Sequence, residues 1–186
     1  MVTENVNKAP LPAPTEPGEL LVVPVEVTAY GAKLRLLPRI LAMDAAIDRY
    51  SNGLWSTSRY SIGGVPYCKL ALWDTRLKDW VARDAPSGGE YAGVPGLSRA
   101  KADDAGSLYN AMIHWGFWLD IYRLPALSFT AEQLHIVPVQ DNNGKVVGAR
   151  LGQVPQVHLL GRDDAGEINV VQLVDRSGGK IVWQRG

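Results

Sequence analysis

The sequence predicts an α+β fold in three parts. These are an extended N-terminal arm over residues 1–19, a mixed αβ portion over 20–125 with one long buried helix, and an antiparallel β-meander over 126–186. Three observations lead to this prediction. The arm is rich in proline, the centre carries apolar residues at helical spacing, and the last third alternates short β-rich runs with turn residues. We expect residues 20–186 to form a single globular domain.

The composition is that of an ordinary globular domain. The 186 residues are 46% hydrophobic and 20% charged, and a chain of this length buries about 70% of its unfolded surface. The one cysteine, Cys68, excludes an intrachain disulfide framework and a zinc site built on several thiolates. Nineteen basic residues balance nineteen acidic ones, so the strongly basic signature of a dedicated nucleic-acid binder is missing.

The arm contains four prolines and few large apolar side chains. Such a segment cannot offset its own ordering entropy, and alone it favours an extended, polyproline-like conformation. We expect it to become ordered only against another surface, most simply a neighbouring subunit. The predicted interface residues in the arm are Pro10, Pro12, Pro14 and Pro17.

A strand and a helix are predicted to follow the arm. Residues 20–30 are rich in valine, and Pro24 favours an edge position or a bulge in this strand. Gly31 is expected to end it. A helix is then predicted to start at Pro38 and to run to Tyr50, where Asn52 and Gly53 supply a left-handed stop.

The next segment predicts a hairpin. Residues 54–60 and 65–73 flank the turn residues Gly63 and Gly64, and the second run alternates apolar and polar side chains. Asp74 is expected to cap a short helix after the hairpin. The apolar residues of this helix would be Leu77, Trp80 and Val81.

A loop and the longest helix come next. Residues 85–97 are rich in glycine and proline, which favours a long surface loop. Ser98 can cap a helix that continues to Tyr122 and stops before Pro125. It is apolar on both sides, so we expect it at the centre of the domain or in an oligomer interface. Its main apolar stripe consists of Leu108, Met112, Trp115, Leu119 and Tyr122.

The C-terminal third is predicted to form short strands. Thr130 and Gln133 can form a capping box for one turn. Residues 168–174 are apolar on both faces, which indicates an interior strand. We expect a small antiparallel sheet that packs over the long helix. The strand-like runs are residues 134–139, 145–151, 156–160, 167–174 and 180–183.

No group of residues predicts a catalytic, cofactor or metal site. The histidines His114, His135 and His158 are too few and too scattered to predict a metal site. Asp120 stands in the most apolar helix, where a buried carboxylate could act as a general acid, but we expect it to form a structural pair with Arg123. Cys68, inside an alternating strand, is expected to be a buried, inert thiol.

Six tryptophans are many for this length. Trp80, Trp115 and Trp118 lie at helical spacing and are expected in the core. The other three are expected at strand ends, where they can be half exposed and contribute to an interface, because tryptophan concentrates at contact hot spots. These three are Trp55, Trp73 and Trp183.

Together these features favour a non-catalytic structural subunit of a large homo- or hetero-oligomeric assembly, for example a phage virion head, neck or tail component. Its partners would be copies of itself or other assembly subunits, without cofactor, membrane or nucleic acid. We expect it in a virion or in the cytoplasm, since no signal peptide is recognisable. A second hypothesis is a glycan- or nucleic-acid-binding module that uses the three exposed tryptophans and the basic segment after Lys33. A third is a hydrolase that uses Asp120 and a histidine.

Overall fold

The structure, a computed structural model, describes residue 12 and residues 14–175 and 177–185. It is an α+β fold, mostly β, with antiparallel sheets. In chain order the elements are η1 (Pro17–Glu19, a 3-10 helix), β1 (Leu20–Thr28), β2 (Gly31–Pro38), α1 (Ile40–Ser51), β3 (Trp55–Ile62), β4 (Val65–Asp74), β5 (Asp79–Pro86), α2 (Arg99–His114), α3 (Leu119–Tyr122), β6 (Leu127–Thr130), β7 (Ile136–Gln140), β8 (Val146–Leu151), β9 (Gln156–Arg162), β10 (Ile168–Val174) and β11 (Lys180–Gln184).

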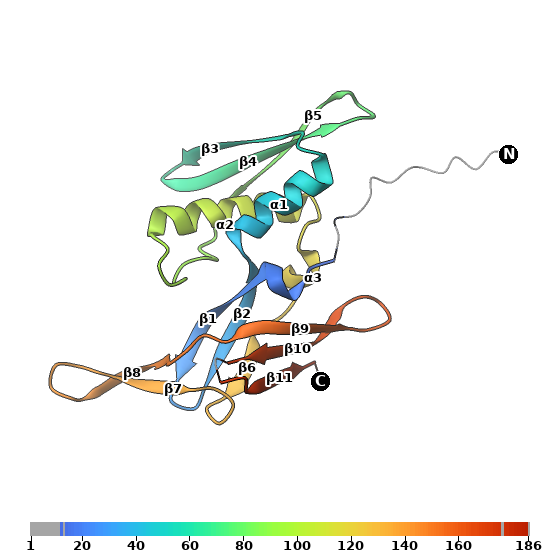
Figure 1. Cartoon of the computed structure of the whole chain (residues 1–186). Helices are drawn as coiled ribbons and strands as arrows, with labels where there is room; N and C mark the ends of the chain where they lie inside the picture. The colour runs from blue at the N-terminus through green and yellow to red at the C-terminus, as the bar shows by residue number, and fades with distance from the viewer. Residues whose placement is uncertain (1–11, 13, 176, 186) are drawn as a thin grey trace.

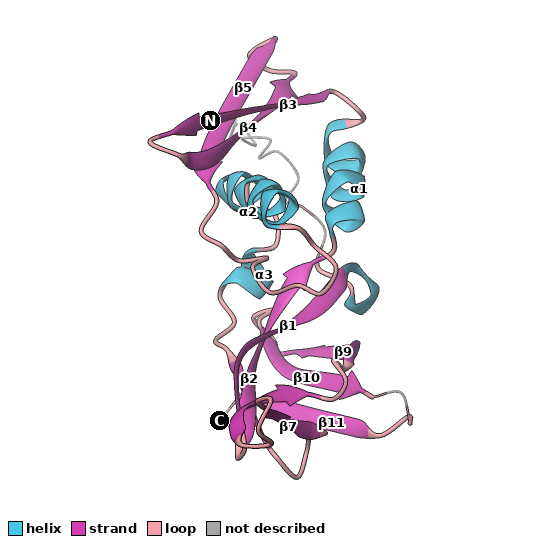
Figure 2. Ribbon diagram, turned by 90° about the vertical axis from the view of Figure 1, so that its left-hand side faces the viewer, coloured by secondary structure: helices cyan, strands magenta, loops and turns pink. Residues whose placement is uncertain are grey.

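Two lobes lie on either side of a waist (Figures 1 and 2). The helical lobe contains α1, α2 and the sheet β3-β4-β5, and both helices lie on one face of that sheet. The strand lobe contains the sheets β1-β2-β6 and β11-β10-β9 and the hairpin β7-β8. In the part of the chain that is described, no helix is both long and apolar enough to cross a membrane.

The β1–β2 hairpin belongs to both hydrophobic cores. Because side chains alternate between the faces of a strand, Val22 and Leu34 point into the core of the strand lobe, whereas Val23 and Leu37 pack in the core of the helical lobe. The register shifts between Pro24 and Glu26, which confirms the bulge predicted at this proline. The hairpin therefore joins the two lobes through buried side chains on both of its faces.

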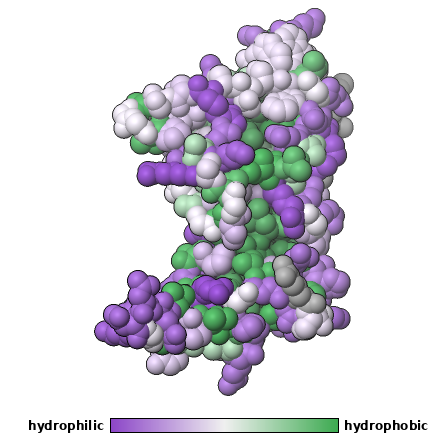
Figure 3. All heavy atoms as spheres, turned by 60° about the vertical axis from the view of Figure 1, so that its left-hand side comes forward, coloured by the Kyte–Doolittle hydropathy of each residue, from purple (hydrophilic) through white to green (hydrophobic). Residues whose placement is uncertain are grey.

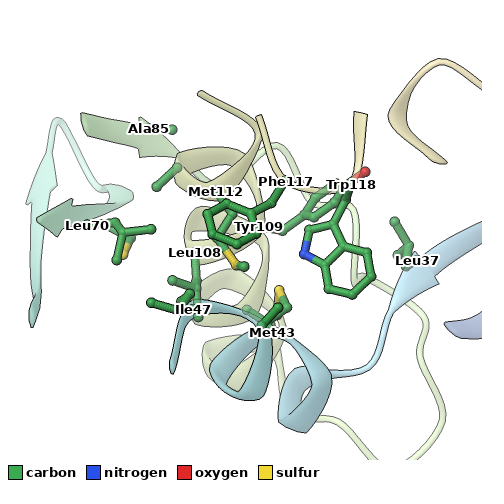
Figure 4. Packing of buried hydrophobic residues seen from close by; sticks show 14 of the residues in the cluster. Leu37, Met43, Ile47, Leu70, Ala85, Leu108, Tyr109, Met112, Phe117 and Trp118 are labelled. Carbon is green, nitrogen blue, oxygen red and sulfur yellow. The ribbon is translucent and has the colours of Figure 1, made fainter. Parts of the chain in front are cut away.

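The helical lobe has a closely packed core (Figure 4). Met43 and Ile47 of α1, Leu70 of β4 and Met112 of α2 are fully buried and come together there. The prediction of helix α1 and its stop is confirmed, since Asn52 caps it in the left-handed region with φ of 51°, but the predicted start at Pro38 is wrong, because Pro38 ends β2 and α1 begins at Ile40. The β3–β4 hairpin around Gly63 and Gly64 is confirmed as well.

The short helix predicted after Asp74 is wrong. Asp74 accepts hydrogen bonds from the backbone N–H groups of Arg76 and Leu77, but these close a turn, and residues 79–86 continue as strand β5 beside β4. A few apolar positions fit helix and strand periods equally well, and pairing with β4 decides between them. Trp80, expected in the core, is 46% exposed as a result.

The long helix predicted from Ser98 to Tyr122 is also wrong at its C-terminal end. Ser98 caps α2 as expected, accepting from the N–H of Lys101, but α2 ends at His114. Gly116 with φ of 91° and Trp118 with φ of 57° turn the backbone into the left-handed region. The indole of Trp118 thereby reaches the core of the helical lobe (Figure 4), where no hydrogen-bond acceptor for its N–H exists among the described residues.

The C-terminal strands form as predicted but pack elsewhere. Strand β10 lies between β9 and β11, in agreement with its prediction as an interior strand. Its buried residues Ile168, Val171 and Leu173 share a core with the β1–β2 hairpin and β6, so the meander does not cover the long helix. The strands β2 and β6, absent from the prediction, provide the apolar face that the meander needs.

Replacing Leu34 by alanine tests the shared hairpin. Leu34 is completely buried, so its truncation should lower the free energy of unfolding by about 2–5 kcal/mol. Urea unfolding followed by circular dichroism measures this loss. As a matched control, Leu77→Ala in the exposed β4–β5 turn should change stability by less than about 0.5 kcal/mol. Equal effects of the two substitutions would contradict the packing described.

Candidate interaction site

An apolar groove lies at the waist between the two lobes. Its volume is about 500 Å³, within the range of about 300–1,000 Å³ that is usual for ligand pockets. Three segments build it: residues 18–21, the N-terminal half of α1, and the loop before α2. Figure 3 shows a band of apolar atoms across this waist. The apolar side chains that line the groove include Leu21, Ile40, Leu41, Val94 and Leu97.

The wall formed by residues 87–97 is held in place by Tyr91. Its side chain is completely buried, and its hydroxyl donates a hydrogen bond of 2.7 Å to the carbonyl oxygen of Pro38. Its ring also packs edge-on against Tyr109. Burial raises the pKa of Tyr91 far above its ordinary value, so the phenol keeps the proton that it donates. The predicted surface loop is therefore anchored in the core at its centre.

The N-terminal half of α1 presents apolar side chains to the groove. Leu41 is 83% exposed and Ile40 is 36% exposed, although both stand in a helix whose Met43 and Ile47 are fully buried. Exposed leucines are common when single, but a contiguous apolar groove marks an interaction site. The sequence did not predict this site, because its helical spacing does not distinguish the exposed Ile40 and Leu41 from the buried apolar residues of α1.

The end of the arm is bound to its own domain. The backbone N–H of Thr15 and its hydroxyl both donate to the carboxylate of Asp120, at 3.3 Å and 2.7 Å. The guanidinium of Arg162 donates to the carbonyl oxygen of Thr15 and to Asp120. Thr15 is only 4% exposed. The arm that was expected to lie outside the domain up to residue 19 is thus part of the domain from Thr15 onward.

The carboxylate of Asp120 is a structural anchor. Burial alone would raise its pKa, but the hydrogen bonds from Thr15 and Arg162 outweigh burial and hold the pKa below its ordinary value. Arg162, on β9, pairs with it at 2.7 Å, and the predicted partner Arg123 was wrong. An ionised carboxylate has no proton to donate, so Asp120 is unsuited to the general-acid role considered for it.

The predicted interface residues do not come together. Pro12 and Pro17 are half-buried and Pro14 is exposed, whereas Pro10 lies outside the described residues. Trp183, on β11, packs half-buried against the core of the strand lobe. Trp55 also packs against a core, and its indole N–H donates to Asp48.

Trp73 belongs to a second candidate surface, the open face of the sheet β3-β4-β5. Its partner across the strands is Trp80, with ring centroids 5.7 Å apart at 74°. Towards the other end of the same face, Tyr60 and Tyr67 stack at 5.3 Å and 16°. The hydroxyl of Tyr60 donates to Asp84, and this hydrogen bond raises the pKa of Tyr60 to about 12. This surface therefore carries two aromatic pairs, of which the sequence indicated only Trp73.

The remaining candidates for chemistry lie apart. Within the described ranges, no three His, Cys, Asp or Glu side chains are arranged to hold a metal ion. His158 is exposed on β9, and His135 precedes β7. Cys68 is completely buried, and burial raises its pKa to about 11, although Arg59 beside it lowers the pKa. The thiol is therefore protonated near neutral pH, which is unfavourable for a nucleophile.

The anchor at Asp120 predicts a pH-dependent contribution to stability. Because folding lowers the pKa of Asp120, its contribution is full above the ordinary aspartate value of about 3.9 and is lost as the pH falls through the folded value. Asp120→Asn should therefore lower the free energy of unfolding by about 2 kcal/mol at pH 7 and match the native protein in strong acid. Urea unfolding at a series of pH values measures this. Asp164→Asn, at an exposed turn, is the control; a pH-independent loss in Asp120→Asn would contradict the anchor.

Comparisons with known proteins returned no match: no protein family, no curated protein and no solved structure is significantly similar to this chain.

Proposed function

We propose that the protein is a non-catalytic subunit of an assembly built from copies of itself, and that the waist groove is a contact surface between subunits. The observation that carries this proposal is the groove of about 500 Å³ with Leu41 beside it at 83% exposure. Leaving such a surface in water forgoes about 25 cal/mol for each Å² of apolar area. A phage virion component is one example of such an assembly, located in a virion or in the cytoplasm.

The β7–β8 hairpin supports the same proposal. It is a two-stranded sheet of its own, and its base packs against the core of the strand lobe through Leu151 and Ile136. Val146 and Val147 on β8 are 57% and 61% exposed. The hairpin projects from one side of the strand lobe (Figure 1). Successive side chains point to opposite faces of a strand, so the two valines leave an exposed apolar side chain on each face of the hairpin, and either face is suited to contact another chain.

The mass in solution tests the proposal. We expect light scattering to give a multiple of the 20.3 kDa chain mass. Leu41→Glu should shift the population towards single chains. Replacing a leucine that the contact buries by a charged side chain costs about 2 kcal/mol, or roughly thirtyfold in the dissociation constant. Leu77→Glu, a matched leucine in an exposed turn, should leave the mass unchanged. A native protein of single-chain mass at every concentration would contradict the proposal.

A second candidate function is a binding module that stacks flat rings, of sugars or of nucleic-acid bases, on the open face of β3-β4-β5. The two aromatic pairs Trp73–Trp80 and Tyr60–Tyr67 favour it, because aromatic faces stack on bases without regard to sequence. Lys69 lies between the pairs on the same face but opposite Asp84. This balance of charge is less suited to a phosphate backbone than an excess of lysine would be.

Retention on immobilised single-stranded DNA or on a glycan array tests the second candidate. Trp80→Ala should abolish retention on the matrix that the native protein binds, with a loss of about 1–3 kcal/mol per stacked base in the case of DNA. Tyr30→Ala removes an aromatic ring that is 88% exposed in the β1–β2 turn and should have no effect. Equal retention of all three proteins would exclude this surface as the binding site.

A further inference from the structure

We propose that the waist groove receives the proline-rich N-terminal segment, residues 2–12, of a neighbouring copy of this chain. This inference rests on the proposed function, which requires contacts between copies but does not say which segments make them. The partner surfaces would then be an arm on one subunit and a groove on the next.

The anchor fixes where the arm leaves its own domain. Thr15 is bound to Asp120 and Arg162, on the side of α3 and β9. The chain then makes the short turn η1, and Gly18 and Glu19 line the groove. The anchor at Thr15 therefore fixes the point from which the arm extends, and the residues that follow Thr15 lead to the groove.

The prolines disfavour a return of the arm to its own groove. To enter it, the chain would have to reverse direction close to Thr15. Pro10, Pro12 and Pro14 stand at alternate positions just upstream, and each proline fixes its own backbone angle and restricts the residue before it to extended conformations. An extended segment rises about 3.1 Å per residue. Fourteen residues before Thr15 thus span up to roughly 43 Å, enough to reach across a subunit contact.

The chemistry of the segment suits the groove. The apolar residues Val2, Val6 and Leu11 are spaced along the arm, and Leu11 stands between two prolines. A proline-rich segment loses little conformational entropy when it docks, because its backbone is already extended and makes no internal hydrogen bonds. The groove offers leucine, isoleucine and valine side chains for such a contact.

The groove is also a fixed receptor. The carboxylate of Glu19 accepts from the guanidinium of Arg49 at 2.9 Å, and the backbone N–H of Arg39 donates to the carbonyl oxygen of Glu19 at 2.7 Å. These bonds fasten the rim to α1, while Tyr91 fastens the opposite wall. A preformed groove lowers the entropic cost of binding. Because arm and groove are different surfaces, two copies that exchange arms reciprocally form a closed two-fold dimer, whereas one-way insertion generates a ring or a filament.

Disulfide trapping tests the inference. Leu11→Cys is introduced in one preparation and Leu41→Cys in a second, tagged preparation, and the mixture is oxidised with diamide. The native Cys68 is present in every preparation and is completely buried, so any crosslink that it forms sets the background level. We expect a crosslinked species that contains one chain of each kind. Leu11→Cys mixed with Leu77→Cys, which places the second thiol in the exposed β4–β5 turn, should give no more than the background.

Two further outcomes separate this inference from the proposed function. In a chain that carries both Leu11→Cys and Leu41→Cys, an intramolecular disulfide at high dilution would overturn the exchange between copies. Suppose that deletion of residues 2–12 leaves a folded protein of unchanged assembled mass, and that the full-length Leu11→Cys and Leu41→Cys proteins form no mixed disulfide. The arm is then not the contact, while the assembly proposal survives. A native protein of single-chain mass would overturn both. A mixed disulfide together with a fall in mass on deletion supports the inference.

Discussion

The structure depends on the packing of one hairpin, β1–β2, into two cores at once. Leu34 and Leu36 face the strand lobe, and Leu37 and Val23 face the helical lobe. Each lobe therefore buries apolar surface against the same backbone, and the period of two in side-chain direction fixes how the lobes are joined. The waist lies where the hairpin passes from the core of one lobe to the core of the other. The groove lies beside this passage, and Leu21 of β1 is one of its lining residues.

Local signals allowed much of the fold to be predicted. The left-handed stop at Asn52, the turn at Gly63 and Gly64 and the cap at Ser98 are all confirmed, because each depends on residues adjacent in sequence. The failures depend on distant partners. Residues 79–86 become a strand because β4 lies beside them, and β2 was missed because its pairing with β1 and β6 decides its state.

The site was harder to predict than the fold. Trp55 and Trp183 were expected to be half exposed at strand ends, and each is half-buried against a core. Composition does not separate an aromatic ring that packs in this way from one that contacts a partner. The anchor of the arm joins Thr15, Asp120 and Arg162, which are far apart in sequence. A signal for the groove did exist. Ile40 and Leu41 extend the apolar surface of α1 beyond the residues that one buried stripe needs.

In the proposed assembly, the waist is the contact surface between copies of the chain. Hydrogen exchange measured at several protein concentrations tests it directly, because association protects only the amides that it covers. Protection in α1 and in residues 87–97 should rise with protein concentration, while β3 and the β4–β5 turn should keep their exchange rates. Protection that is independent of concentration at the waist, or that rises only on the open face of β3-β4-β5, would contradict it.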